Sequence, residues 1–146
     1  IDNYYKQAAP YIKEYFNLIN ANYALMEKTQ GYQWYAGPWE SRDNALAEFY
    51  PKAYLNRCLE ILDSAKKEIE KMEDGQLKRT LMTRLEKEEL SPRYIVIEHY
   101  KEYYDNATLR NLFTGFQEDA NRLGLSYFKE SGLISKRYET WWLSVN

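Results

Sequence analysis

Cysteine and histidine are almost missing from this chain, which has one of each in 146 residues. The lone cysteine, Cys58, excludes an internal disulfide and a cysteine-rich zinc site. The lone histidine, His99, excludes most histidine-based catalytic clusters. Neither sign of charge dominates, because 20 Lys and Arg residues are matched by 22 Asp and Glu residues, so a basic nucleic-acid-binding surface is not expected. The sequence has no run of about 18 apolar residues, and we predict no transmembrane segment.

Aromatic residues, by contrast, are abundant: the chain has 15 Tyr, 5 Phe and 4 Trp residues. Tyrosine carries a large apolar ring with a polar tip, so it suits half-exposed positions and protein interfaces. The length is sufficient for one packed core, and we expect residues 1–146 to form a single helical domain. Because the chain begins at Ile1 and no signal pattern precedes it, we expect it to be a piece of a longer multidomain protein.

The spacing of apolar residues predicts helices along most of the chain. Steps of three or four residues, which mark one face of a helix, run from Ala8 to Met26, from Leu55 to Met72 and from Leu109 to Leu123. Gly31 and Gly124 follow the first and the last of these runs and predict where the helices end. No segment alternates strictly between apolar and polar residues, so no sheet is expected. We predict an all-α bundle of four to five helices.

Two stretches are less regular. Between about Gln76 and Tyr104, Ser91-Pro92 either begins a new helix or lies within one long helix that bends there. The apolar face of this stretch includes Leu77, Leu81 and Leu85. The last residues, Leu125–Asn146, are expected to form short helical pieces around a glycine, with Trp141 and Trp142 docking near the end.

The connection from Gln30 to Tyr50 is long and rich in aromatic residues. Flat aromatic faces suit the C–H surface of a sugar ring, while neighbouring polar side chains can bond its hydroxyl groups. The candidate carbohydrate-binding residues are Tyr32, Trp34, Tyr35, Trp39, Glu40, Arg42 and Asp43. The alternative is that Trp34 and Trp39 fold back and seal the bundle, and the sequence leaves both interpretations open.

Candidate catalytic groups are few. Cys58 lies on the apolar face of its predicted helix, where a thiol behaves as a small hydrophobic side chain. His99 also lies on an apolar helix face, which favours a structural role. The carboxylates that could serve as an acid pair are Glu88, Glu89 and Glu98, and a solvated charge run explains the first two. We therefore predict no catalytic residue, no metal site and no cofactor for this chain.

The segment Tyr4–Phe16 reads Tyr-Tyr-Lys-Gln-Ala-Ala-Pro-Tyr-Ile-Lys-Glu-Tyr-Phe. It resembles the start of the C-terminal helical region in an uncharacterised family of secreted bacterial proteins that look like glycoside hydrolases and are common in gut Bacteroidetes. A glycine would be expected in that pattern where this chain has Lys6. The stretch Arg84–Tyr94 is similar to the long helix of the family, so the resemblance covers most of the chain.

The resemblance implies a parent protein that acts on polysaccharides and is exported to the periplasm or the cell surface. Its catalytic acids would lie in a barrel similar to those of α-glucuronidases and β-hexosaminidases, and none can be placed on this sequence. We therefore expect a non-catalytic helical module that packs on the neighbouring domain of the same polypeptide and lines its substrate groove. Two alternatives stay open: a self-contained module that binds a polysaccharide or oligosaccharide, and a helical protein-interaction domain unrelated to sugars.

Overall fold

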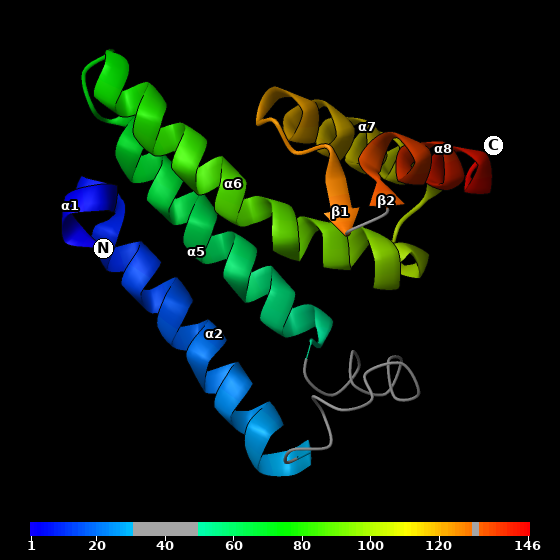
Figure 1. The fold of residues 1–146 in the computed structure, drawn as a ribbon, viewed down its shortest axis with the longest axis horizontal. Helices are drawn as coiled ribbons and strands as arrows, with labels where there is room; N and C mark the ends of the chain where they lie inside the picture. The colour runs from blue at the N-terminus through cyan, green and yellow to red at the C-terminus, as the bar shows by residue number, and fades with distance from the viewer. Residues whose placement is uncertain (31–49, 130–131) are drawn as a thin grey trace. The chain divides into compact units, whose positions relative to one another are not determined.

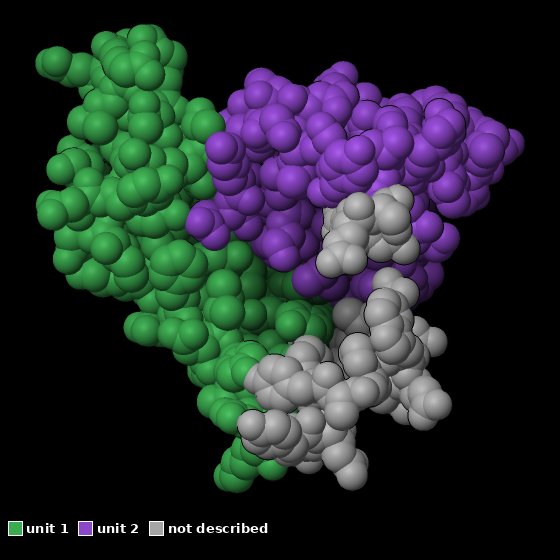
Figure 2. Space-filling view, in the orientation of Figure 1, with its two compact units in different colours: residues 1–85 green, residues 86–146 purple. Residues whose placement is uncertain are grey.

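The computed structural model describes residues 1–30, 50–129 and 132–146 (Figure 1). Helices account for most of these residues, and the predicted all-α fold class is confirmed. The described residues divide into two compact units, Ile1–Leu85 and Glu86–Asn146 (Figure 2). Each unit has its own cluster of buried side chains.

Helix α6 (Gln76–His99) supplies side chains to both cores. Its first half buries Leu81 and Leu85 in the first unit, and its second half buries Leu90 and Ile97 in the second. The charged run between these two apolar pairs coincides with the boundary between the units. Helical periodicity alone cannot distinguish one continuous apolar face from a face that serves two cores.

Among its described residues, 1–30 and 50–85, the first unit contains four further elements besides the first half of α6. These are α1 (Asp2–Tyr5), the 3-10 turn η1 (Lys6–Ala8), α2 (Ala9–Gln30) and α5 (Lys52–Glu70). Helices α2 and α5 pack side by side (Figure 1), and both agree with the predicted helices. Pro10 lies in the first turn of α2, where its nitrogen needs no intrahelical hydrogen bond.

The core of the first unit is built from the predicted apolar faces. Its buried residues include Ala8, Ile12, Tyr15, Cys58, Leu62, Ala65 and Ile69, and Leu55 of α5 is also buried. Ile61 is buried as well, because the apolar face of α5 is wider than a single stripe. Tyr23 and Leu77 also fall on predicted stripes, but both are exposed. Leu77 lies in the first turn of α6.

In the second unit, α6 runs without interruption through Pro92, so the single-helix alternative is correct and a new helix at this proline is wrong. The proline lacks the N–H that would bond the carbonyl group of Glu88, and burial of its ring helps to offset that loss. The helix ends at His99, before the predicted Tyr104, and the 3-10 turn η2 (Lys101–Tyr103) follows.

Helix α7 (Asn106–Arg122) begins and ends close to where the sequence predicts. At its start, the carboxylate of Asp105 accepts a hydrogen bond of 2.7 Å from the backbone N–H of Thr108, which is an N-cap. At its end, Gly124 has a φ of 78°, and the N–H of Leu125 donates to a carbonyl group five residues earlier at 2.8 Å. This pattern is a Schellman motif, which requires a left-handed residue and favours glycine.

Just after α7 the chain forms two short strands where the sequence predicts a helical piece, whereas the helix predicted after Gly132 is present. Strands β1 (Tyr127–Lys129) and β2 (Gly132–Leu133) pair antiparallel, with Tyr127 opposite Leu133. Strands of three and two residues are too short to show an alternating pattern in the sequence. Helix α8 (Ile134–Ser144) follows and packs beside α7.

Aromatic rings fill the core of the second unit. Trp141 stacks on Phe113 with ring centres 5.5 Å apart, and it meets Phe116 edge-on at 5.7 Å. Ring pairs of this kind add about 0.5–1.5 kcal/mol beyond the burial of their surface. Trp142 is exposed, so the prediction that both tryptophans dock is correct for Trp141 and wrong for Trp142.

Candidate functional site

The predicted carbohydrate-binding residues cannot be placed in the fold. Tyr32, Trp34, Tyr35, Trp39, Glu40, Arg42 and Asp43 all lie outside the described residues. The two interpretations of this connection, a sugar platform or a seal over the bundle, therefore stay predictions. The candidate groups that the structure does describe are the thiol of Cys58, the carboxylates of α6 and a cavity in the second unit.

Cys58 is buried in the core of the first unit, as predicted. Burial raises the pKa of its thiol, although a hydrogen bond with Tyr54 acts in the opposite direction. Only the thiolate form of cysteine is a strong nucleophile, so a raised pKa leaves the side chain unreactive near neutral pH. The geometry gives Cys58 a packing role.

The carboxylate of Glu98 is held by Arg137 and Trp141 of α8. Its side chain is 5% exposed and forms an ion pair with Arg137 through both carboxylate oxygens. One of these oxygens also accepts a hydrogen bond of 2.8 Å from the indole N–H of Trp141. Burial by itself would raise the pKa of Glu98, but the hydrogen bonds from Arg137 and Trp141 outweigh it and hold that pKa below its ordinary value.

This arrangement suits a structural carboxylate better than a catalytic acid. A general acid needs a raised pKa to hold its proton near neutral pH, and Glu98 has the opposite shift. Arg137 could not be predicted as its partner, because the two residues are 39 positions apart and no local spacing connects them.

The other two candidate carboxylates differ from each other. Glu88 is half-buried, whereas Glu89 is buried with only 7% of its surface exposed. The interpretation of this run as a solvated face is therefore wrong for Glu89. His99 is the last residue of α6 and is half-buried, in agreement with the predicted structural histidine.

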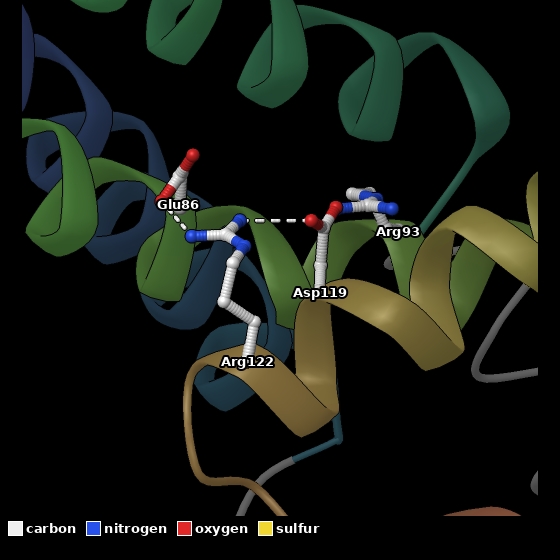
Figure 3. A network of polar contacts seen from close by, with 4 residues as sticks. All are labelled: Glu86, Arg93, Asp119 and Arg122. Carbon is white, nitrogen blue, oxygen red and sulfur yellow. Dashed lines mark hydrogen bonds and ion pairs between the residues drawn. The ribbon is translucent and has the colours of Figure 1, made fainter.

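A neutral network of four charged side chains joins α6 to α7 (Figure 3). The guanidinium of Arg122 lies 2.8 Å from a carboxylate oxygen of Glu86 and 2.8 Å from one of Asp119. Asp119 also accepts a hydrogen bond of 2.7 Å from Arg93. Burial would raise the pKa of Asp119, but hydrogen bonds from Arg122 and Arg93 lower it. Two positive and two negative groups alternate along the network. It therefore links α6 to α7 and carries no net charge.

A cavity of about 560 Å³ lies in the second unit beside this network. Lys87, Ser91 and Tyr94 line it from α6, where spacings of four and three residues place them on one helix face. From α7 and β1, the lining includes Phe116, Leu123 and Tyr127. Sequence reasoning missed this cavity, because its far wall depends on the Schellman turn and on a strand too short to predict.

Metal and membrane sites are not found in the described part of the chain. Among residues 1–30, 50–129 and 132–146, no three His, Cys, Asp or Glu side chains are grouped so that they could hold a metal ion. No helix in these ranges is long and apolar enough to cross a membrane.

No family model matches this sequence, and no curated protein or solved structure matches it significantly. The resemblance to a glycoside-hydrolase-like family therefore depends on the residues of Tyr4–Phe16 and Arg84–Tyr94 alone. In the structure these two segments meet in the first unit, because the side chain of Arg84 lies over the ring of Tyr4.

Proposed function

We propose that this chain is a non-catalytic helical module of an exported, carbohydrate-active bacterial protein, and that it packs on a neighbouring domain of the same polypeptide. The resemblance of Tyr4–Phe16 and Arg84–Tyr94 supplies the carbohydrate context. Exposed side chains of the second unit support the packing role. The non-catalytic role is supported by the candidate reactive groups, which are buried or engaged in contacts within the fold.

The observation that carries the packing role is a series of exposed apolar side chains near the C-terminal end. Between positions 125 and 143, the exposed large apolar residues are Leu125, Tyr127, Leu133, Trp142 and Leu143. Leu143 is 76% exposed although it lies within α8. Scattered apolar residues are ordinary on a protein surface, but several large ones within so short a segment are typical of an interface.

The candidate catalytic groups support the non-catalytic part of the proposal. The Cys58 thiol is buried with a raised pKa, and the Glu98 carboxylate is neutralised by Arg137. A glycoside hydrolase of the usual kind needs two carboxyl groups on either side of a sugar. Glu98 is occupied by its ion pair and by Trp141, so it is not available for such a pair.

The proposal is tested by producing the chain and its neighbouring domain as separate polypeptides and measuring their association by sedimentation. We expect a stable complex, and we expect Leu143→Glu to weaken it at least tenfold, because a buried, unpaired carboxylate costs several kcal/mol. Ser135→Glu is the matched control, since it adds the same charge to an exposed polar position of the same helix. Absence of a complex would contradict the proposal.

Two further measurements separate the alternatives. Glycans are titrated into the isolated chain while tryptophan fluorescence is followed. A saturable response that Trp34→Ala and Trp39→Ala abolish would favour a self-contained carbohydrate-binding module. Hydrolysis of any glycoside by the purified chain would overturn the non-catalytic role, and self-association in place of binding to the neighbour would favour a protein-interaction domain.

A further inference from the structure

The cavity in the second unit has a rigid aromatic floor. Tyr94 lies 6.0 Å from Phe116 and 5.9 Å from Trp141, measured between ring centres. Phe116 and Trp141 also contact each other and are buried. Rings held on several sides by other rings have little freedom to collapse into an empty space. A volume of about 560 Å³ is within the usual range for a small-molecule site, roughly 300–1,000 Å³.

Two polar groups line the same cavity without a partner among the residues that the structure describes. Lys87 and Ser91 both line it from consecutive turns of α6, and neither side chain has a hydrogen bond or an ion pair with any other group in the described part of the chain. Lys87 and Ser91 are exposed, so both groups can be approached from solvent. The neighbouring Glu86 carboxylate is held by Arg122, which leaves the ammonium group of Lys87 to attract an anion.

We infer that this cavity binds a small organic anion with an apolar body, such as an aromatic or aliphatic carboxylate or sulfonate. The acidic group contacts the Lys87 ammonium and the Ser91 hydroxyl, and the apolar body lies against Tyr94, Phe116 and Leu123. This site goes beyond the proposed packing role and does not depend on it. Leu125 and Tyr127 belong to both surfaces, so the site is tested on the chain without its neighbouring domain.

The lining favours this class of ligand over a neutral sugar. Sugar recognition needs several polar partners to satisfy the ring hydroxyl groups, because an unpaired hydroxyl loses its hydrogen bonds to water. The cavity offers leucine side chains at Leu90, Leu123 and Leu125, which cannot replace those bonds. Of the tyrosines in the lining, Tyr94 is hydrogen-bonded to Arg137. The cationic group of Lys87 and the hydroxyl groups of Ser91 and Tyr127 match a single acidic group on an apolar body better than they match a polyol.

The test uses two fluorescent probes that differ only in their charge. Anilinonaphthalene sulfonate has the acidic group and the apolar body, and phenylnaphthylamine has the same body without the sulfonate. We expect the unmodified chain to bind the sulfonate probe saturably at one site per chain. Lys87→Met should weaken that binding about fivefold, the effect of one partly exposed charge pair, and should leave binding of the neutral probe unchanged.

Further variants test whether the effect depends on this particular lysine and on this particular cavity. Lys101→Met removes an exposed lysine elsewhere in the second unit and should change neither affinity. Ser91→Trp fills the cavity and should abolish binding of both probes, whereas Ser64→Trp, at an exposed serine of α5, should leave binding intact. Circular dichroism confirms that each variant is folded.

The proposal is overturned by any of three results. The first is that binding of the sulfonate probe does not saturate. The second is that Lys87→Met weakens the binding of both probes equally or of neither. The third is that the folded Ser91→Trp variant binds the probes as the unmodified chain does. Should Ser91→Trp fail to fold, the two-probe comparison for Lys87→Met decides by itself.

Discussion

The guanidinium carbon of Arg84 lies 3.5 Å from the centre of the Tyr4 ring, and the same side chain donates a hydrogen bond to the Tyr4 carbonyl oxygen. The two residues are 80 positions apart, so this contact joins the start of the chain to α6. The Arg84 side chain therefore links the two ends of the first unit by a cation–π contact and a hydrogen bond.

Replacing Arg84 should destabilise the first unit. Arg84→Ala removes both interactions, and we expect the free energy of unfolding to fall by about 1–2 kcal/mol. Denaturant unfolding followed by circular dichroism gives this value. Arg79→Ala is the control, because Arg79 is exposed on the same helix and donates a hydrogen bond to Gln76 three residues earlier; its effect should stay below about 0.5 kcal/mol. Equal effects would show that the Tyr4 contact contributes nothing.

Lys6 has a backbone conformation that suits glycine. Its φ is 49° and its ψ is −120°, a left-handed conformation that costs a residue with a Cβ atom about 1–3 kcal/mol. The family pattern that Tyr4–Phe16 resembles has glycine at this position. The backbone at Lys6 therefore has a conformation that glycine would adopt without strain.

We therefore predict that Lys6→Gly stabilises the first unit by about 1 kcal/mol, after the larger conformational entropy of unfolded glycine is subtracted. Thermal and denaturant unfolding measure the difference. Ala21→Gly, at an exposed position within α2, provides the comparison and should cost about 1 kcal/mol. A loss of stability in both variants would mean that the turn is not strained.

Gly124 gives a second test of backbone conformation, in the second unit. A Cβ atom would meet nothing within 4 Å at either Gly124 or Gly75, but only Gly124 has a positive φ, of 78°. An added Cβ atom would therefore meet no steric clash at either site, and the two sites differ in backbone strain. We expect Gly124→Ala to cost about 1 kcal/mol and Gly75→Ala to be neutral or slightly stabilising, as measured by denaturant unfolding. Similar values for both would contradict the Schellman interpretation.

Features that depend on local interactions could be predicted from the sequence, and features that depend on the tertiary fold could not. The ends of α7 were predictable because Asp105 and Gly124 act on backbone groups only a few residues away. The faces of α2 and α5 were predictable from periodicity. The β1–β2 hairpin, the ion pair of Glu98 with Arg137 and the cavity were not, because each depends on groups that only the tertiary fold brings together.

Glu98 should be the most sensitive carboxylate of the second unit. Glu98→Gln removes the ion pair and leaves Arg137, whose side chain is 35% exposed, without its anionic partner. Breaking a buried pair in this way costs several kcal/mol, and with a partly exposed arginine we expect about 2–3 kcal/mol. The control is Glu139→Gln, which breaks an exposed pair with Lys136 and should cost less than about 0.5 kcal/mol.

The Glu98 pair also predicts how this stability depends on pH. The pKa of Glu98 is lower in the folded chain than its ordinary value of 4.5, so the unfolded chain binds the proton more readily. The stabilisation is therefore fully present above about pH 4.5 and is lost as the pH falls through the folded pKa. Denaturant unfolding of the unmodified chain and of Glu98→Gln at pH 7, 4.5 and 3 should show a difference that shrinks with acid, because a protonated Glu98 resembles glutamine. A constant difference would mean that packing around the side chain, rather than its charge, stabilises this part of the core.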